Sequence, residues 1–416
     1  MNVLHLSCLV CGKTYPPDKV DYVCPNHGDH GVLDVVYDYE RIGATLDREA
    51  IARDDMWALR PLLPVGEGAA LPPLRIGGTP LYRSPRLARW AGVAEVWIKD
   101  EGVQPTGSLK DRASALALVK ADERKAGVIT TASTGNAAAA LAGVAASVGR
   151  PTVIFVPAAA SEAKVAQLLA YGATVLLVEG SYDDAVELCL RSAEKFDWYN
   201  RTTGFNPYMS EGKKTVALEI ARQLDWHMPD AVFVSVGDGC IVGSLWKGFH
   251  DLLMLGWIGG IPRIIGVQAA GSSYLAEAWA NGEDVLTKPP IHPETVADSI
   301  AAGLPRDRIK AMRAIVRSDG AFVTVTDEEI LAAIPTVASQ AGVFGEPAAA
   351  ASWAGVEVAR ATGVISAGDR VVSISTGTGL KDIPAAMRAV SAAGAHAHHV
   401  APDLDSVATA LEEWTG

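Results

Sequence analysis

The sequence predicts an α/β protein with two open, doubly wound parallel-sheet lobes and a small Cys/His-rich, zinc-ribbon-like extension at the N-terminus. Short apolar segments recur from about residue 95, and helical segments separate most of them. This alternation is typical of parallel βαβ units. The chain has 416 residues, more than one compact core accommodates, so two or more lobes are expected. The first forty residues are instead rich in Cys, His, Pro and Gly.

The individual elements follow from short apolar runs and from helix signals between them. In chain order, strands are expected over residues 128–133, 151–157, 173–180, 231–237, 263–269, 321–325 and 370–375. Helices are expected after Asn136, over 161–172 with a glycine cap at Gly172, over 181–196 and over 403–414. The chain is expected to divide into an extension over 1–40, a larger lobe from 41–105 and 205–395, a smaller lobe over 106–204 and a C-terminal helical segment over 396–416.

Composition excludes several classes of function. The net charge is −12, whereas a nucleic-acid-binding protein needs a basic face. No apolar run reaches the roughly 18 residues of a membrane-spanning helix. The N-terminal residues lack the basic start and the small-residue cleavage site of a signal peptide. We therefore expect a cytoplasmic protein that binds neither nucleic acid nor a membrane.

Three loops that follow expected strands are small and polar, and ligands bind at the carboxyl ends of strands in such sheets. The first contains Ser133, Thr134, Gly135 and Asn136 at the start of a helix. Hydroxyl groups, an amide and free backbone N–H groups at such a place can hold a carboxylate or a phosphate. A helix cap without any ligand would use the same residues.

The second loop contains Gly237 and Gly239, which allow backbone N–H groups to surround an anion. A dinucleotide fingerprint would read G-x-G-x-x-G, but the third glycine, Gly243, comes one residue late, and no acidic residue ends a strand about 20 residues on. A nicotinamide-dependent enzyme is therefore disfavoured. Asp238 must turn its carboxylate away from any phosphate held there. The third loop, residues 375–382, is by itself only a glycine-rich turn.

Lys110 lies between a polar turn, residues 106–108, and an apolar helical pattern that begins after Asp111 and Arg112. A lysine at a helix start is most often a solvated surface charge. At this junction the amine can be partly desolvated, which lowers its pKa and makes it a nucleophile towards an aldehyde.

Several motifs occur in an order that resembles the threonine synthase branch of the fold type II pyridoxal-phosphate enzymes. They are TGSLKDR (106–112), STGN (133–136), the glycine-rich loop, GVFGEPAAAASWAGV (342–356) and STGTGLKD (375–382), together with GGTPLYR (77–83) and NPYMSEGKKTVALEI (206–220). The resemblance spans roughly residues 75–390. It implies pyridoxal 5′-phosphate as cofactor, a small amino-acid substrate and a homodimer.

The resemblance also implies a role for each matching residue. Lys110 would bind pyridoxal phosphate as an imine and, once released, remove the Cα proton of the substrate. Asn136 would hydrogen-bond the ring hydroxyl, and Thr376 the pyridine nitrogen. The cofactor phosphate would be held by Gly237, Asp238, Gly239, Cys240 and Ile241, and the substrate carboxylate by Ser133, Thr134, Asn136 and Ala137. Glu346 is expected to cap a helix near the cofactor, with no chemical role.

The implied reaction is elimination of phosphate from O-phosphohomoserine with addition of water, which gives threonine. Three departures from the family pattern bear on this substrate. A threonine and an arginine that usually help to bind the substrate phosphate are replaced by Ala137 and Met209, and a histidine is replaced by Thr378.

Other cations could compensate for the lost arginine: Lys213, Lys214 or Arg83. The alternatives are cysteate synthase-like β-replacement on O-phosphoserine and threonine or serine dehydratase activity. A catalytically silent binding protein with the same fold is the alternative that is not an enzyme.

The N-terminal extension contains C-x2-C followed by C-x2-H, formed by Cys8, Cys11, Cys24 and His27. Two such pairs suit a tetrahedral zinc ion. His30 is the competing fourth ligand, and a metal-free knuckle held by packing is the alternative. Because all four ligands would be protein atoms, we expect a structural and not a catalytic zinc ion.

Overall fold

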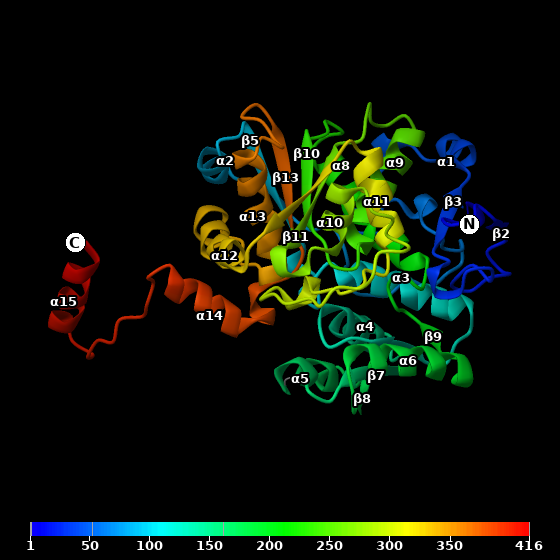
Figure 1. Ribbon diagram of the computed structural model, residues 1–416, viewed down its shortest axis with the longest axis horizontal. Helices are drawn as coiled ribbons and strands as arrows, with labels where there is room; N and C mark the ends of the chain where they lie inside the picture. Colours follow the sequence, from blue (N-terminus) through cyan, green and yellow to red (C-terminus); the bar gives the residue numbers. More distant parts are fainter. Residues whose placement is uncertain (1, 52, 161, 416) are drawn as a thin grey trace.

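Three β-sheets organise the part of the chain that the computed structural model describes, residues 2–51, 53–160 and 162–415 (Figure 1). The largest sheet has the order β12-β11-β10-β13-β5-β4, and all its neighbouring pairs are parallel except the antiparallel pair β4–β5. The prediction of an α/β fold with two parallel-sheet lobes is thus confirmed, with one antiparallel edge strand in addition. The strands of this sheet are β4 (Leu81–Arg83), β5 (Glu95–Asp100), β10 (Ala231–Ser235), β11 (Arg263–Ala269), β12 (Ala321–Val325) and β13 (Arg370–Ser375).

Alternating side chains of this sheet enter two cores, because successive residues of a strand point to opposite faces. In β10, Val232 and Val234 pack into one core and Phe233 into the other. The first core is covered by α8 (Thr215–Gln223), α9 (Cys240–Met254), α10 (Tyr274–Asn281) and α11 (Arg308–Arg317). The second is covered by α2 (Pro85–Ala91), α12 (Asp327–Ala341) and α13 (Pro347–Ala361).

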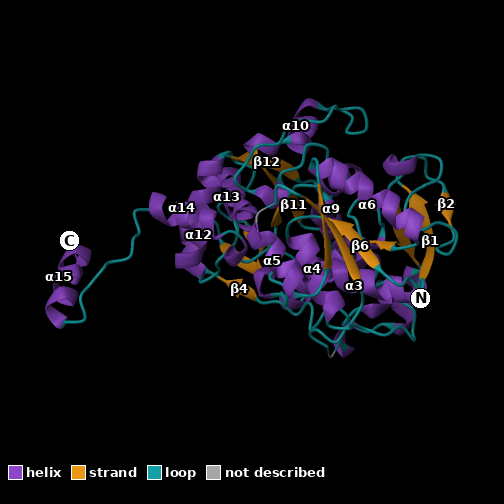
Figure 2. Cartoon of the chain, turned by 90° about the horizontal axis from the view of Figure 1, so that it is seen from below, coloured by secondary structure: helices purple, strands orange, loops and turns teal. Residues whose placement is uncertain are grey.

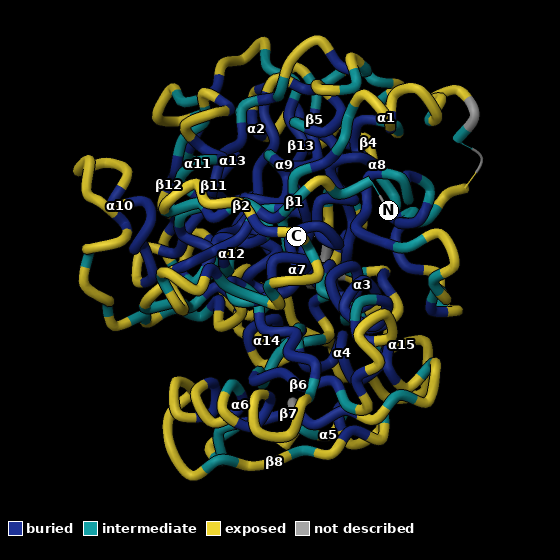
Figure 3. The backbone as a smooth tube through the Cα atoms, turned by 90° about the vertical axis from the view of Figure 1, so that its right-hand side faces the viewer, coloured by how far each residue is buried: buried dark blue, intermediate teal, exposed yellow. Residues whose placement is uncertain are grey.

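The smaller sheet is entirely parallel, with the order β8-β7-β6-β9. Its strands are β6 (Ile129–Ala132), β7 (Thr152–Pro157), β8 (Thr174–Val178) and β9 (Tyr199–Asn200). In β7, Ile154 packs towards α4 (Asn136–Ala146) and α5 (Glu162–Ala170), and Phe155 packs towards α6 (Tyr182–Phe196). Residue 161, the first residue of the helix expected over 161–172, lies outside the described residues. β8 forms the exposed edge of this lobe (Figure 3).

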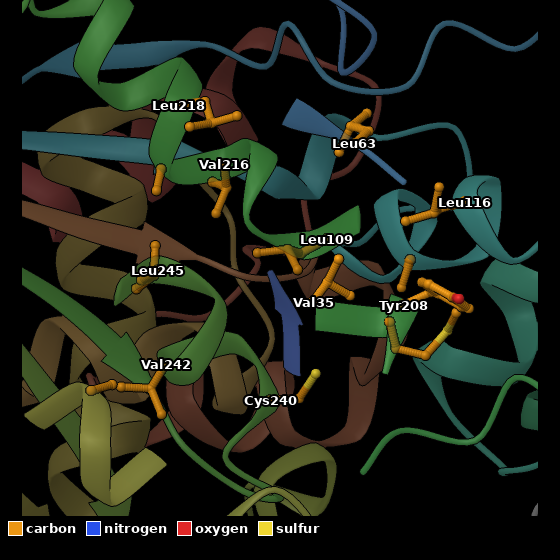
Figure 4. Close-up of a cluster of buried hydrophobic side chains, with 14 of the residues drawn as sticks. Val35, Leu63, Leu109, Leu116, Tyr208, Val216, Leu218, Cys240, Val242 and Leu245 are labelled. Atoms are coloured by element: carbon orange, nitrogen blue, oxygen red, sulfur yellow. The ribbon is translucent and has the colours of Figure 1, made fainter. Parts of the chain in front are cut away.

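The N-terminal extension is a three-stranded antiparallel sheet with the order β2-β1-β3, formed by β1 (Val3–Cys8), β2 (Thr14–Tyr15) and β3 (Leu33–Tyr37). It packs against the larger lobe. Val35 of β3 enters the same apolar cluster as Leu109 and Cys240 (Figure 4), and the Tyr37 hydroxyl donates to Glu211 Oε2 over 2.6 Å.

The remaining helices connect these parts. They are α1 (Tyr39–Thr45), α3 (Lys110–Glu123), α7 (Tyr208–Lys213), α14 (Ile383–Ala392) and α15 (Leu404–Thr415). α15 stands away from the body of the protein at the end of an extended segment (Figures 1 and 2). No helix among the described residues has both the length and the apolar character needed to cross a bilayer.

The strands that the sequence did not predict are the three of the N-terminal extension, β1 to β3, and β4, β5 and β9 of the two lobes. β5 carries Glu95, Lys99 and Asp100, and these charges hide its apolar character in the sequence. Lys99 is nevertheless buried, since its ammonium group donates to Glu219 Oε2 over 2.9 Å. β9 has only two residues, too few to give a pattern.

Candidate active site

The turn before Lys110 is held by backbone hydrogen bonds to the loop after β13. Leu109 N donates to Thr376 O over 3.0 Å, and Thr378 N donates to Gly107 O over 3.0 Å. Ser108 and Gly377 form an antiparallel bridge between these two bonds. Two of the loops singled out in the sequence therefore meet, and they bring Lys110 and Thr376 to the same place.

Lys110 is the first residue of α3, and its amine is perturbed. Desolvation, with smaller contributions from the nearby cations Lys213 and Arg201, lowers the pKa of Lys110 to about 8, although Glu346 opposes the shift. A lysine with a pKa near 8 has a substantial neutral fraction at physiological pH, and the neutral amine is the nucleophilic form.

Asn136 and Glu346 form a buried pair beside Lys110. Asn136 Nδ2 donates to Glu346 Oε1 over 2.7 Å. Burial raises the pKa of Glu346 to about 7, although Lys110 and Asn136 oppose the rise. Glu346 occupies the N-cap position of α13, as expected, but its side chain makes no cap hydrogen bond and turns to Asn136 instead. A Cβ atom at Gly377 would lie 2.7 Å from Glu346 Oε1, so a side chain there would displace the Glu346 carboxylate.

The first polar loop leads into α4. Gly135 is the N-cap residue of this helix and makes no side-chain cap, so capping alone does not explain the run of polar residues. Ser133 Oγ accepts a hydrogen bond from Gly135 N over 3.2 Å. Ser133, Thr134, Asn136 and Ala137 therefore lie at the end of β6, where the first backbone N–H groups of α4 are available to an anion.

The second polar loop leads into α9 and requires its glycines. Gly239 has a φ of +89°, and a Cβ atom there would lie 2.8 Å from Ala311 Cβ. A Cβ atom at Gly237 would lie 2.9 Å from Ile300 Cα. Asp238 turns towards Arg306, whose backbone N–H donates to Asp238 Oδ1 over 3.4 Å, as an anion in the loop would require. Cys240, the first residue of α9, is buried, and Ile241 follows it on the same turn.

Two buried cations lie in this region. Arg201 was not predicted to belong to the site, and Lys213 was considered only as a replacement for the lost arginine. Arg201 directly follows β9 and is 1% exposed; its Nε donates to Ser114 Oγ over 3.4 Å. Among the described residues, no group accepts a hydrogen bond from Arg201 Nη2. Lys213 is also 1% exposed, and its Nζ makes a 3.3 Å hydrogen bond to Thr203 Oγ1. Arg201 escaped notice because the strand before it is too short to give a pattern.

The other two candidate cations are engaged elsewhere. Lys214 forms buried ion pairs with Glu211, 2.5 Å away, and with Asp251, 2.6 Å away. Arg83 is exposed, and its ion pair with Glu95 has an N–O distance of 2.5 Å. Met209, which stands where the family commonly has arginine, is fully buried in the large apolar core.

The N-terminal extension brings four potential metal ligands together. The ligand atoms of Cys8, Cys11, Cys24 and His27 all lie within 4.8 Å of one another. His30 lies outside this cluster, and its Nδ1 is 2.9 Å from Arg308 Nη2. Burial opposes ionisation of Cys24, but hydrogen bonds from Tyr15 and His27 lower the pKa of its thiol to about 6. Thiolates and a neutral imidazole in this arrangement are the donor set that zinc prefers.

The residues around Lys110 fit pyridoxal phosphate on structural grounds. The site combines a lysine of lowered pKa with a glycine-bearing loop at a helix N-terminus, which suits a phosphate. An aldehyde that carries a phosphate group satisfies the amine and the loop together.

Comparisons with known proteins agree with this geometry. Residues 73–377 match the family model described as "Pyridoxal-phosphate dependent enzyme". Threonine synthase of Methanocaldococcus jannaschii is 38% identical over 386 residues, which are 92% of this chain and 94% of the relative. Threonine synthase of Methanosarcina acetivorans is 41% identical over 381 residues, 91% of this chain and 92% of the relative.

Solved structures share the fold. The processed form of threonine deaminase isoform 2 from Solanum lycopersicum superposes with a TM-score of 0.65 at 24% identity, and the match covers 76% of this chain and 83% of that one. Maize serine racemase gives a TM-score of 0.63 at 22% identity, with 76% and 93% covered. Taken with the lysine turn and the phosphate-type loop, these matches show that the chain belongs to the pyridoxal-phosphate dependent enzyme family, with the threonine synthases as its relatives.

Proposed function

We propose that this protein is a pyridoxal-phosphate-dependent lyase of the threonine synthase type, which eliminates phosphate from O-phosphohomoserine and adds water to form threonine. The observation that carries the proposal is the position of Lys110. Its amine has a lowered pKa and lies where the loops after β6, β10 and β13 converge. Relatives with this name match over most of both chains.

Each loop contributes a different part of the cofactor site. Lys110 would bind the aldehyde carbon, Asn136 would hydrogen-bond the ring hydroxyl and Thr376 the ring nitrogen. The backbone N–H groups of Gly237 to Ile241 would hold the phosphate. When bound, pyridoxal phosphate supplies an electron sink that stabilises negative charge at the substrate Cα.

The remaining chemistry belongs to residues of the chain. Ser133, Thr134, Asn136 and Ala137 hold the substrate carboxylate at the N-terminus of α4, which fixes the Cα–H bond relative to Lys110. The neutral Lys110 amine accepts the Cα proton. Glu346, buried and with a raised pKa, keeps Asn136 oriented through their 2.7 Å hydrogen bond.

A second candidate is β-replacement on O-phosphoserine, in the manner of cysteate synthase. It is favoured by the apolar residues Ala137 and Met209 at two positions that commonly bind the substrate phosphate in the family. Threonine or serine dehydratase activity and catalytic silence remain as further outcomes of the same test.

The test is a substrate panel on the cofactor-loaded protein. O-phosphohomoserine, O-phosphoserine with and without sulfite, threonine and serine are supplied, and phosphate, ammonia and new amino acids are measured. We expect phosphate and threonine from O-phosphohomoserine, with Lys110→Ala as the inactive control. Turnover of O-phosphoserine alone supports the second candidate. A protein that never acquires the visible absorbance of a lysine-bound cofactor contradicts both.

We also propose that Cys8, Cys11, Cys24 and His27 bind one structural zinc ion. The closeness of their four ligand atoms supports this site, and the contact of His30 with Arg308 supports His27 as the fourth ligand. Metal analysis of the purified protein should give one zinc per chain.

We further propose a cytoplasmic homodimer and a division of each chain at residues 40, 105, 204 and 395, with the segment over 106–204 as the smaller lobe. The separate four-stranded sheet formed by β6 to β9 supports this division. Sedimentation analysis of the loaded protein tests the dimer, and limited proteolysis tests the boundaries.

A further inference from the structure

The segment from β9 to the end of α7 contains two buried cations and lacks the expected arginine. Arg201 and Lys213 are each 1% exposed, whereas Met209, between them in sequence, packs into the apolar core. A buried guanidinium group is strongly disfavoured unless an anion pairs with it. Among the described residues, the only side chain that hydrogen-bonds Arg201 is the neutral Ser114, at 3.4 Å, and Arg201 Nη2 has no partner.

The two cations lie near Lys110. Both lower the pKa of Lys110, after desolvation as the main cause. Ser114, which holds Arg201, lies one helical turn after Lys110 and therefore on the same face of α3. Lys213 is also close to the Cys240 thiol at the start of α9, whose pKa burial raises and Lys213 lowers. An anion between Arg201 and Lys213 is thus a near neighbour of Lys110.

The position of Arg201 separates this anion from the cofactor phosphate. β9 runs parallel to β6, so residue 201 emerges at the same sheet edge as the loop that begins at Ser133. That loop is the seat proposed above for the substrate carboxylate. The cofactor phosphate has a separate cradle, the glycine-bearing loop before α9, which belongs to the larger sheet.

We propose that Arg201 and Lys213 form the subsite for the distal anionic group of the amino-acid substrate, and that they take over the task of the arginine replaced by Met209. The inference rests on the proposed function and specifies its substrate class: an amino acid with a phosphate monoester at the end of its side chain. A guanidinium group and an ammonium group together match the charge of a phosphate dianion, and the guanidinium can bind two of its oxygens.

The test measures binding, not turnover, on the cofactor-loaded protein. Two ligands differ only in the distal anion: the phosphonate analogue of O-phosphohomoserine, with CH₂ in place of the bridging oxygen, and L-norvaline, which lacks the phosphonate. Binding is followed through the visible absorbance of the cofactor. We expect Arg201→Met and Lys213→Met each to weaken phosphonate binding at least about 10-fold and to leave norvaline binding unchanged.

Arg83→Met, which removes an exposed cation, is the matched control and should change neither affinity. Arg201→Lys keeps the charge and should fall between wild type and Arg201→Met; it also serves as the informative variant if Arg201→Met does not fold. Lower cofactor affinity with an unchanged ratio of phosphonate to norvaline binding would assign the two cations to the cofactor phosphate and overturn the inference.

Two results separate this inference from the proposed function. If wild type binds both ligands with equal affinity, the anion subsite is refuted and the amino-acid site stands. If it binds neither, the proposed function fails, and the inference fails with it.

Discussion

Lys110 and Arg112 lie two residues apart on α3, yet they belong to two opposite kinds of buried charge. Arg112 is fully paired: it contacts Glu101 at 2.7 Å and Glu219 at 2.6 Å, and Lys99 contacts Glu219 at 2.9 Å. Lys110 lies instead with the cations Arg201 and Lys213, and its one carboxylate neighbour of note, Glu346, has a raised pKa. On one side of the helix the buried charges are paired; on the other, positive charge is in excess, and we propose that a ligand balances it.

Whether a buried charge is paired distinguishes a structural charge from a functional one. A paired buried charge stabilises the fold only as a set, because removal of one member leaves the others unpaired. An unpaired buried charge destabilises the empty protein and is retained because a bound group supplies the missing partner. The predictions below test this contrast from the largest expected effect to the smallest.

Removal of the Lys110 amine should give the largest functional change. We expect Lys110→Ala to lower turnover by more than about 10⁴-fold, since the variant lacks both the covalent attachment and the proton acceptor. The visible absorbance of the bound cofactor, sensitive to borohydride in wild type, should disappear. The cofactor-free variant should unfold at the same urea concentration as the cofactor-free wild type or a higher one. A large loss of stability would place Lys110 with the structural charges.

Removal of Arg112 should instead lower the stability of the fold. We expect Arg112→Met to lower the free energy of unfolding by about 3–5 kcal/mol, because Glu101 is left buried without a counter-ion and Glu219 keeps only Lys99. Urea denaturation of the cofactor-free protein measures this. Arg201→Met, in the same assay, should be neutral or stabilising. Equal losses in the two variants would remove the distinction between the two kinds of charge.

The cysteine cluster extends the contrast to negative charge. Its four ligand atoms lie within 4.8 Å of one another. Thiolates this close together repel one another unless a cation binds between them, just as the buried Arg201 requires an anion. We expect Cys24→Ser to abolish stoichiometric zinc and to lower the thermal midpoint by about 5 °C, because the end of β1 and the loop around Cys24 lose the link between them. A chelator should reproduce the shift in wild type and have no effect on the variant. An unchanged midpoint in both would contradict a structural metal.

Glu346 should give the smallest effect, visible as a pH dependence. Burial raises the pKa of Glu346 from 4.5 to about 7, so between these values the folded protein binds more protons than the unfolded chain. Its contribution to stability is therefore present at low pH and is lost as pH rises from about 4.5 to about 7. Glu346→Gln should remove this decline, which is at most about 3 kcal/mol for a shift of this size, in the cofactor-free protein. Identical pH profiles for the two proteins would show that Glu346 does not titrate in this range.

Much of the fold was predictable because the buried parallel strands are almost wholly apolar. β11 and β12 begin and end where the apolar runs do. β5 was hidden by Lys99, whose charge is neutralised by Glu219, 120 residues further along the chain. A pairing over that distance leaves no local trace in the sequence.

The candidate site was predictable where chemistry follows from short motifs. Lys110 and the glycine loop stand out because a helix start and positive φ angles restrict residue type. The role of Glu346 beside Asn136 and the burial of Arg201 depend on how separate strands meet. Met209 shows what the sequence alone does not predict. Its position reveals that an arginine is missing, but only the folded chain shows that Arg201 and Lys213 lie near Lys110.

The turn that carries Lys110 is fixed to the loop after β13 by main-chain atoms, through Leu109 to Thr376 and Thr378 to Gly107. Main-chain atoms are common to all residue types, but this attachment still restricts the sequence at Gly107, whose φ of +87° favours glycine. It also ties the lysine mechanically to the larger sheet. A shift of the four-stranded sheet relative to the larger sheet would therefore change the distance between the proposed carboxylate seat and the Lys110 amine.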